Sequence, residues 1–540
     1  MLAGCAAASI AANLWSFRTG SMLNYGDAVA HLHIARRIFD SHRPGLTQLG
    51  SVWLPLPHLL LVPFVAVYAW WANGIAGAIP SALAYLASCA GLYRLARRWL
   101  GPAESALALA FFALNPNLLY MQTTAMTEPL FLCEMIWAVV WLVEWSARMD
   151  ARRAETPEAE AGRRARATAE KADRLLWKIA AVLIAAVFTR YDGWVMALLA
   201  WVGIGVVLLR CGGLHSRAFW WASAVLAAAP IAWFIYNATV FGDWLTFARG
   251  PYSAKAIELR TTTGWPPHPG WHNPWVGLLF FLKVSEMDAA AAAWGNVLLV
   301  LSVLGMAWGW LIAGMRGYLW TLLLWLPVPF YAYSVAFASV PIFIPPWWPH
   351  SWYNTRYGLE LLPALALGLG FAAYLILAVV RAFKPRWFLP AAALLFVLTA
   401  LNAWQVLREH PLCYVEGAKN YAAREHYEQV IPAALRALLA TRPGGVVLMD
   451  TSQYPQVVAL TGIPLRQTIN ESDKEFYGAA LAAPADHASI VLAFDNDGIA
   501  QAVKEHPQGL REVDRFTAPG QPGGTLYVSD TQASTGVPYR

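Results

Sequence analysis

The chain has 540 residues, of which 58% are hydrophobic and only 13% are charged. Soluble chains normally carry about 25% charged residues, so this composition excludes an ordinary soluble globular protein and indicates a polytopic membrane protein. The formal net charge of +6 is modest, and in a membrane protein the placement of the positive residues matters more than their sum. We predict membrane lipids as partners and no nucleic acid.

Long apolar segments recur as far as residue 406, and many reach the ~20 residues that a bilayer requires. They lie at 2–17, 73–95, 103–120, 125–146, 175–189, 192–209, 218–240, 291–314, 317–340, 359–381 and 387–406. We therefore expect about 11 transmembrane helices, if 175–209 is a tight helical pair and not one long helix. The apolar segment 53–71 contains Pro55, Pro57 and Pro63, so we predict an interfacial or re-entrant piece there.

The connections between these segments alternate strictly between rich and poor in Lys and Arg. The rich ones lie at 93–99, 147–174, 210–217, 314–318 and 380–387, and the poor ones include 114–122 and 189–194. Under the positive-inside rule the rich connections are cytoplasmic. The connection 147–174 is mixed in charge and rich in Ala, which predicts a solvated helix or a disordered linker. The chain after residue 407 then lies outside the cytoplasm.

The residues after 407 differ in kind from those before. Three buried-strand patterns, GVVLMD at 445–450, SIVLAFD at 489–495 and GTLYVSD at 524–530, alternate with helical stretches. The fold class predicted is therefore an all-α polytopic membrane domain followed by a small extracytoplasmic α/β domain. We place the transmembrane domain at 1–408 and the soluble domain at 409–540, in a multi-pass protein of the bacterial inner membrane.

An unusual polar stretch, LNYGDAVAHLHIARRIFD, follows the first apolar segment. Asp27 and His31 are four residues apart, so they share one face of a helix. Asp27 is a candidate general base, because a carboxylate can take a proton from an attacking hydroxyl while a phosphate departs. The alternative is that Asp27 is only the N-cap of that helix. His31 and His33 point to different faces, and one of them is a candidate for binding phosphate or a metal; the alternative is that they are simply packed or solvated. His58 is a further candidate site residue.

Further ionisable residues lie beside apolar segments on the same, outer side. Such residues cost free energy at membrane depth and usually mark function. Glu128 begins a span, where a carboxylate also suits the helix dipole. Arg190 and Asp192 flank a tight turn, where a simple salt bridge is the alternative. Arg356 precedes Tyr357 after an aromatic loop, and it is either a bidentate phosphate ligand or an interfacial anchor.

The order of these motifs resembles the GT-C glycosyltransferases. That superfamily includes the protein O-mannosyltransferases (glycosyltransferase family 39), the aminoarabinose transferases of lipid A and the catalytic subunits of oligosaccharyltransferases. The resemblance covers about residues 1–410. It is carried by Asp27 followed by a helical AxxH, by AMTEPLF at 125–131, by FTRYDGW at 188–194 and by NTRYGLELLPALAL at 354–367.

The resemblance implies an inverting hexosyl- or pentosyltransferase. Its donor would be a polyprenyl-phosphate-linked sugar, and a lipid, glycan or protein acceptor would enter from the outer face. Asp27 matches the catalytic acid position of the first outer loop, and Glu128 matches a second acidic position. Arg356 and Tyr357 match a pair near the donor phosphate. The remaining site residues expected are the phosphate ligands Arg190, Arg249 and Lys255, and the acceptor-side or supporting residues His31, His58 and Asp192.

Two departures from the family pattern bear on the acceptor and on a metal. Ala28 follows Asp27, so the Asp-Glu doublet of the mannosyltransferases is missing, which argues against protein O-mannosylation in particular. The first outer loop has no DxD sequence, and no cofactor is certain. A possible divalent metal ion would be held by Asp27, Glu128 and His58.

Two other functions are compatible with a polytopic chain. A transporter or lipid flippase would spread polar residues along a path to both faces and would show inverted repeats. A non-catalytic scaffold would use the soluble domain to bind partners and would tolerate loss of Asp27. The polar residues gather on one side and no repeat is visible, which favours the transferase.

Overall fold

The computed structural model describes residues 1–154, 161–211, 213–261, 266–313 and 315–530. It separates into two compact units, and each is built from several stretches of the chain. The first unit contains Met1–Trp15, Ser51–Pro57 and Pro80–Glu416. The second contains Ser16–Gly50, His58–Ile79 and Gly417–Arg540. Residues 155–160, within the predicted linker 147–174, lie outside the described residues.

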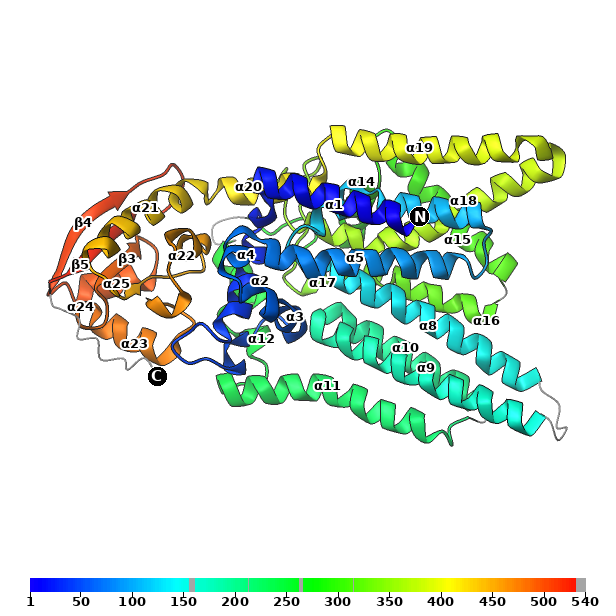
Figure 1. Ribbon diagram of the computed structural model, residues 1–540, viewed down its shortest axis with the longest axis horizontal. Helices are drawn as coiled ribbons and strands as arrows, with labels where there is room; N and C mark the ends of the chain where they lie inside the picture. Colours follow the sequence, from blue (N-terminus) through cyan, green and yellow to red (C-terminus); the bar gives the residue numbers. More distant parts are fainter. Residues whose placement is uncertain (155–160, 212, 262–265, 314, 531–540) are drawn as a thin grey trace. The chain divides into compact units, whose positions relative to one another are not determined.

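The first unit is helical, and its long helices run side by side (Figure 1). Its helices, counting those that continue into the second unit, are α1 (Leu2–Thr19), α5 (Ile75–Ala96), α6 (Pro102–Ala113), α7 (Pro116–Met121), α8 (Glu128–Ala154), α9 (Ala161–Thr189), α10 (Tyr191–Arg210), α11 (Arg217–Phe241), α12 (Thr246–Arg249), α13 (Ala254–Thr261), α14 (Pro274–Ala289), α15 (Gly295–Ala313), α16 (Met315–Tyr318), η3 (Leu319–Trp325), α17 (Pro327–Phe337), η4 (Thr355–Leu361), α18 (Leu362–Phe383), η5 (Pro385–Trp387), α19 (Phe388–Arg408) and α20 (Leu412–Ala422).

Seven helices among the described residues are long and apolar enough to cross a membrane. They are Ile75–Ala96, Glu128–Asp150, Tyr191–Arg210, Arg217–Phe241, Leu319–Phe337, Thr355–Phe383 and Pro385–Ala422. The apolar helices Pro55–Val65, Pro102–Ala113 and Gly295–Leu311 are shorter. These helices confirm the prediction of a polytopic α-helical membrane protein, whereas the number of about 11 spans stays a prediction.

The predicted helical pair at 175–209 is present. Helix α9 ends at Thr189, α10 begins at Tyr191, and Arg190 between them has an extended backbone with φ −149° and ψ 155°. A Cβ on Gly193 would lie 2.2 Å from the Ala186 carbonyl oxygen, so only glycine allows this close turn. Arg190 therefore lies in a break between two helices and not within one continuous helix.

The proline-rich segment 53–71 forms two short helices, α3 (Pro55–Val65) and α4 (Tyr68–Asn73). Helix α3 has 11 residues, which is too short to span a bilayer of ordinary thickness. The structure therefore agrees with the prediction that this segment is not a regular transmembrane span.

Helices α15 and α18 approach so closely that glycine is required at the contact. A Cβ on Gly305 would lie 2.0 Å from the Gly368 carbonyl oxygen, and one on Gly368 would lie 2.2 Å from that of Ser302. The Ser302 hydroxyl donates to the Leu365 carbonyl at 3.1 Å across the same contact. Small residues and a polar bond of this kind are typical of helix association in membranes.

The second unit contains a five-stranded sheet in the order β2-β1-β3-β5-β4. The strands are β1 (Val447–Leu448), β2 (Thr468–Ile469), β3 (Ile490–Phe494), β4 (Leu510–Phe516) and β5 (Gly524–Ser529). β1 pairs with β2 and β3 in parallel, and β5 pairs with β3 and β4 antiparallel. The three predicted strands are confirmed. β2 has two residues and β4 alternates charged with apolar residues, so neither gave a buried-strand pattern.

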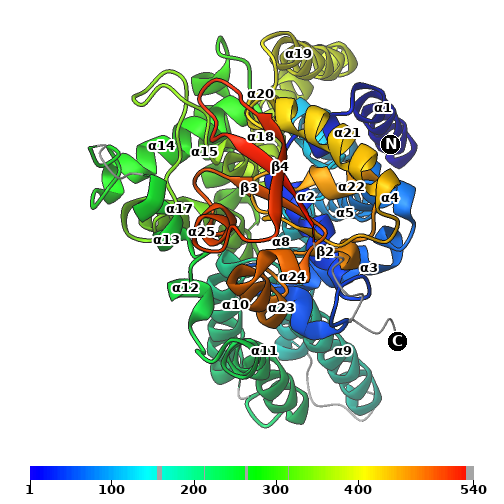
Figure 2. The ribbon, with the colours of Figure 1, turned by 90° about the vertical axis from the view of Figure 1, so that its left-hand side faces the viewer.

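Helices cover both faces of this sheet (Figure 2). α23 (Lys474–Ala482) and α25 (Gly498–Glu505) pack on one face with α24 (Pro484–His487) nearby, and α21 (Glu425–Thr441) and α22 (Gln456–Thr461) belong to the other. Val491 of β3 packs on the first face, and Phe494 contacts Tyr427 of α21 on the second. The sheet therefore has its own hydrophobic core.

The early residues of the second unit are bonded to the sheet region. These residues form η1 (Ser21–Leu23), α2 (Gly26–Arg37), η2 (Leu46–Leu49), the latter part of α3, and α4. The Asp40 carboxylate accepts the Leu465 and Arg466 amides, both at 3.3 Å. The Tyr68 hydroxyl donates to the Ala459 carbonyl at 2.9 Å. The chain passes from the first unit to the second for the last time between Glu416 and Gly417. The predicted domain boundary, between 408 and 409, lies shortly before this point and stays a prediction.

We expect Gly368→Ala to destabilise the first unit by about 1–3 kcal/mol, because the added methyl group must separate α15 from α18. Thermal unfolding in detergent measures this effect. Gly4→Ala in α1 is the matched control, since no atom lies within 4 Å of a Cβ there. Equal melting temperatures for the two variants would contradict the close approach of α15 and α18.

Glu471, just after β2, gives the second unit a pH dependence. Burial, with the nearby Asp450 charge, raises the pKa of Glu471 to about 7, although Glu471 accepts the Thr451 amide at 2.9 Å. A raised carboxyl pKa means that the folded state holds the proton more tightly than the unfolded state. Its stabilising contribution is therefore complete below the ordinary glutamate pKa and is lost as the pH rises through about 7.

We expect the hydrogen-exchange protection of the β1 and β2 amides, corrected for intrinsic exchange, to fall about tenfold or more between pH 5 and pH 8. Glu471→Gln should remove most of this fall. Glu505→Gln, on the exposed end of α25, should leave it unchanged. A wild-type protection that is constant with pH would rule out the shifted Glu471.

Candidate active site

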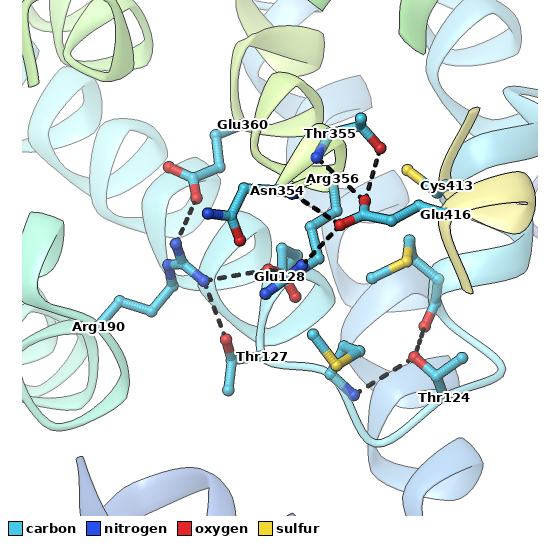
Figure 3. A network of polar contacts seen from close by, with 12 residues as sticks. Thr124, Thr127, Glu128, Arg190, Asn354, Thr355, Arg356, Glu360, Cys413 and Glu416 are labelled. Atoms are coloured by element: carbon cyan, nitrogen blue, oxygen red, sulfur yellow. Dashed lines mark hydrogen bonds and ion pairs between the residues drawn. The ribbon is translucent and has the colours of Figure 1, made fainter. Parts of the chain in front are cut away.

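A buried group of charged and hydroxyl side chains lies in the first unit, where several helices begin or end (Figure 3). We call it the arginine cluster. It consists of Thr127, Glu128, Arg190, Asp192, Tyr331, Arg356, Tyr357, Glu360 and Glu416. Buried charges are stable only when they are paired and hydrogen-bonded, so the partners of each group decide what the cluster can do.

Glu128 links the two arginines through one oxygen atom. Its Oε1 accepts from Arg190 Nη1 and from Arg356 Nε, both at 3.2 Å. Its Oε2 is buried and has no hydrogen-bond partner among the described residues. Glu128 is the first residue of α8, where the helix dipole also favours a negative charge. The carboxylate therefore fixes the distance between the two guanidiniums.

Arg190 uses all three of its guanidinium nitrogens. Nε donates to Asp192 Oδ2 at 3.3 Å, and Nη1 also donates to the Thr127 hydroxyl at 3.0 Å. Nη2 donates to the Tyr331 hydroxyl at 2.7 Å and lies 2.9 Å from Glu360 Oε1. A phosphate that bound Arg190 directly would have to share or displace one of these partners. The structure thus gives Arg190 mainly an organising position.

Glu416 holds the short helix η4, which carries Arg356 and Tyr357. Its carboxylate accepts the Asn354 amide at 2.7 Å and the Thr355 amide and hydroxyl at 3.0 and 2.6 Å (Figure 3). The same carboxylate accepts from Arg356 Nη1 at 3.1 Å. Amides at a helix start have no partner within the helix, so Glu416 supplies one. It therefore orients both the backbone of η4 and its arginine.

The Tyr357 ring lies beside both guanidiniums. Its centroid is 5.1 Å from the Arg190 carbon Cζ and 5.0 Å from that of Arg356, which is within cation–π range. The ring also stacks on Tyr331, with centroids 4.9 Å apart and an interplanar angle of 24°. Two positive groups are thus held together by a shared carboxylate oxygen and a shared aromatic face.

The cluster contains more carboxyl groups than cations. Four carboxyls, of Glu128, Asp192, Glu360 and Glu416, surround two guanidiniums, so full ionisation would leave two buried negative charges in excess. Each guanidinium is therefore shared with more than one carboxyl group. The cluster has the features of a site with oriented guanidiniums, rather than those of a simple anion trap.

Five of the predicted site residues meet in this cluster, namely Glu128, Arg190, Asp192, Arg356 and Tyr357. The other two predicted phosphate ligands of the first unit lie elsewhere. Arg249 forms an exposed ion pair with Asp243 at 2.8 Å, and Lys255 is exposed on α13. Neither contacts the cluster's carboxylates among the described residues. Their contact with a donor phosphate therefore stays a prediction.

The remaining predicted residues, Asp27, His31 and His58, lie in the second unit. Asp27 is half-buried in the first turn of α2, one turn before His31. The N-cap alternative for Asp27 is wrong, because Tyr25 occupies that position and α2 begins at Gly26. A carboxylate in the first turn is still favourable, since it faces the positive end of the helix dipole.

His31 and His58 form a buried pair. His31 Nδ1 and His58 Nε2 are 2.8 Å apart, and the two residues are 2% and 0% exposed. Burial, with His31 and Arg37 nearby, lowers the pKa of His58 well below its usual range, so His58 is neutral. The shared hydrogen bond requires one ring to donate and the other to accept. The acceptor-side or supporting role of the two histidines stays a prediction.

No group of three or more His, Cys, Asp or Glu side chains in the described part of the chain could hold a metal ion. The metal ion that the sequence left open, with Asp27, Glu128 and His58 as ligands, therefore gains no support from either unit by itself.

Four cluster residues were not predicted as site residues: Thr127, Tyr331, Glu360 and Glu416. Glu360 carried a usable signal, because it is a carboxylate inside the apolar stretch 354–367, where an unpaired charge is costly. Glu416 lies beyond the last apolar segment. Tyr331 is one of many aromatic residues in the apolar segment 317–340. Only the folded contacts distinguish them.

No protein-family model matches the chain, and no curated protein matches its sequence. The structure is similar to that of ArnT from Cupriavidus metallidurans bound to undecaprenyl phosphate, with a TM-score of 0.53 and 13% sequence identity. The match covers 97% of this chain and 98% of that chain. ArnT in the apo state matches with a TM-score of 0.50, and the Archaeoglobus fulgidus oligosaccharyltransferase, with a TM-score of 0.39, is too distant to add to the comparison.

The likeness to ArnT extends over nearly the whole length of both chains and confirms the predicted fold class. The chain has an all-α polytopic membrane part and a small α/β part in that order. At 13% identity the likeness concerns the fold and leaves the activity open.

We expect Glu128→Gln to destabilise the first unit by about 3–5 kcal/mol, because it removes the shared partner of two buried cations. The double variant Glu128→Gln/Arg356→Gln should recover part of this loss, which a double-mutant cycle on thermal unfolding measures. The exposed pair Arg94 and Glu144 is the matched control, and its cycle should give less than about 1 kcal/mol. Strictly additive losses for Glu128 and Arg356 would exclude their coupling.

Proposed function

We propose that the chain is an inverting glycosyltransferase that moves a sugar from a polyprenyl-phosphate donor to an acceptor on the outer face of the membrane. The observation that supports this most is the arginine cluster, which places two oriented guanidiniums in a buried site of a membrane protein. The fold adds support, because ArnT shares it and has been solved with undecaprenyl phosphate bound. We further propose that this is the bacterial inner membrane and that the second unit's sheet is extracytoplasmic.

In this proposal Arg356 is the main ligand of the donor phosphate. It lies in η4 with its guanidinium fixed by Glu128 and Glu416, so little conformational entropy is lost when it binds an anion. Arg190 and Tyr357 support it, and Arg249 and Lys255 add positive charge on the first unit's outer loops. The surrounding carboxylates keep the ground-state hold on a singly charged phosphodiester weak.

The reaction itself increases the charge on the phosphate. The acceptor oxygen attacks the anomeric carbon, the bond from that carbon to the phosphate oxygen breaks, and the electron pair leaves with the phosphate. The diester carries one negative charge and the departing monoester carries two. A fixed guanidinium therefore interacts more strongly with the transition state than with the bound donor, which is the requirement for catalysis.

Asp27 stays the proposed general base, which takes the proton from the attacking acceptor hydroxyl. The base accepts the proton of the hydroxyl, and the phosphate leaves with the electron pair of the broken bond. Attack on the side opposite the leaving group inverts the configuration of the anomeric carbon. Glu128 is proposed as the second acidic residue, through its control of Arg190 and Arg356. His31 and His58, behind Asp27 in the second unit, and Asp192, which holds Arg190, are proposed as supporting or acceptor-side groups. The hexose or pentose transferred and the acceptor are left open.

We expect Arg356→Gln to weaken the binding of undecaprenyl phosphate about tenfold or more, because a charge-assisted hydrogen bond contributes about 1.5–3 kcal/mol. Asp27→Asn should bind the lipid as the wild type does, yet it should lose transfer by about 10²–10⁴-fold. Native mass spectrometry in nanodiscs measures binding. Release of free polyprenyl phosphate from a panel of radiolabelled polyprenyl-phosphate sugars, with membrane-extract acceptors, measures transfer.

The controls are Arg94→Gln for binding and Asp530→Asn for transfer, since both residues lie in exposed ion pairs. A wild type that binds no undecaprenyl phosphate would exclude the lipid-linked donor. Movement of labelled lipid across the bilayer without release of the sugar would support the flippase instead. Full transfer by Asp27→Asn would keep the enzyme class and remove Asp27 as the base.

A further inference from the structure

The start of α2, which carries Asp27, is held by residues near the other end of the chain. The Gly26 amide, in the first turn of α2, donates to Asn420 Oδ1 at 2.9 Å. Amides in the first turn of a helix have no acceptor within that helix. The N-cap residue Tyr25 makes no capping hydrogen bond with its side chain, so Asn420 of α20 supplies an acceptor from outside.

Arg424 holds the residues just before this helix. Its Nη2 donates to the Leu23 carbonyl at 3.1 Å and to the Asn24 carbonyl at 2.9 Å. Its Nη1 donates to Glu428 Oε1 at 2.6 Å, and Arg424 as a whole is 8% exposed. Arg424 and Glu428 are thus a buried ion pair of the second unit, and one arm of the arginine is directed at the backbone.

These bonds fix three consecutive points of the chain that leads into Asp27. The carbonyls of Leu23 and Asn24 and the amide of Gly26 are all bonded to α20 and to the N-cap residue of α21, about 400 residues later in the sequence. Asp27 follows directly, so the direction of its Cα–Cβ bond depends on this stretch of backbone. We call these bonds from Asn420 and Arg424 the clamp. Without the clamp, the first turn of α2 would lack these outside partners and would fray as helix ends do.

We propose that Arg424 is a positioning residue for the reaction. With Asn420, it orients the backbone at Asp27 so that the carboxylate is presented to the acceptor hydroxyl. The inference rests on the proposed function, since it assumes that Asp27 is the base. It gives Asn420 and Arg424, which follow the last apolar segment, a role in positioning the base.

A misplacement of about 1 Å in a reacting group can cost about 100-fold in rate. Arg424→Gln should therefore lower kcat by about ten- to 100-fold and change the donor KM little, because the donor phosphate is bound elsewhere. Arg424→Lys keeps a cation that can reach Glu428 and one carbonyl, so it should restore part of the rate. Arg436→Gln should have no effect.

Arg436 is a matched control because it lies in α21, the helix that Arg424 precedes as N-cap residue, and also donates to a backbone carbonyl, that of Leu460. It is exposed, and its bond lies away from α2. An effect that both variants shared would point to general damage to α21 and would overturn the proposal.

The decisive test combines Arg424→Gln with Asp27→Asn. Single-turnover release of polyprenyl phosphate is measured for the two single variants and the double variant, with the donor on which the wild type is active. If Arg424 acts through Asp27, its loss should slow the Asp27→Asn enzyme less than about twofold. An equal loss in both backgrounds would overturn the positioning role, because the effect would then be independent of the base.

Hydrogen exchange gives a readout that needs no substrate. Arg424→Gln should speed exchange of the amides at residues 26–30 about tenfold or more, while the β3 amides at 490–494 keep wild-type protection and report an intact fold. Unchanged exchange at 26–30 would overturn the clamp. A third outcome separates the two claims. If exchange at 26–30 is faster in Arg424→Gln but the wild type releases no polyprenyl phosphate from any donor, the backbone contacts of Arg424 are supported, whereas the proposed function and the positioning role are rejected.

Discussion

The bond on which the candidate site depends most is the one that Glu128 makes to two buried arginines through a single oxygen. A buried guanidinium is costly unless its charge is matched, and Glu128 is the one carboxylate that contacts both guanidiniums. The bond joins the start of α8, the turn between α9 and α10, and η4, which come from three distant parts of the chain. The positions of Arg190, Arg356 and Tyr357 follow from this one contact, because Tyr357 lies beside both cations.

The excess of carboxyl groups around the arginines has a chemical consequence. A site made only of cations would bind a lipid phosphate tightly, and it would hold the product phosphate even more tightly. Carboxylates that share the guanidiniums reduce ground-state binding, yet the positive groups stay in place when charge develops on the leaving group. In the proposed reaction, fixed guanidiniums stabilise the transition state more than the bound donor, and the carboxylates weaken the hold on the product phosphate relative to a site made only of cations.

Much of the fold could be predicted from the sequence, since apolar segments of bilayer length and the alternation of basic connections have simple physical causes. Glu128, Arg190 and Arg356 could be singled out because charges beside apolar segments are costly and rarely accidental. Arg249 and Lys255 are outside the arginine cluster, and their contact with a donor phosphate stays a prediction. Glu416 and Arg424 could not be found, since their roles are hydrogen bonds to backbone groups that are distant in sequence. The bonds of Asp40 and Tyr68 to the sheet region escaped prediction for the same reason.

The second unit shows why a membrane enzyme would retain a soluble part that carries no recognisable reaction motif. The residues around Asp27 are polar, and α2 has 12 residues, so it gains too little from its own hydrogen bonds to be stable alone. The ion pair of Arg424 and Glu428 is buried within the second unit, where water cannot compete with the bonds from Arg424 to the Leu23 and Asn24 carbonyls. A loop at a membrane surface would otherwise be the most mobile place for a catalytic base. Bonds from Asn420 and Arg424 tie this backbone to the second unit, so under the proposed function the position of Asp27 depends on residues about 400 positions later in the sequence.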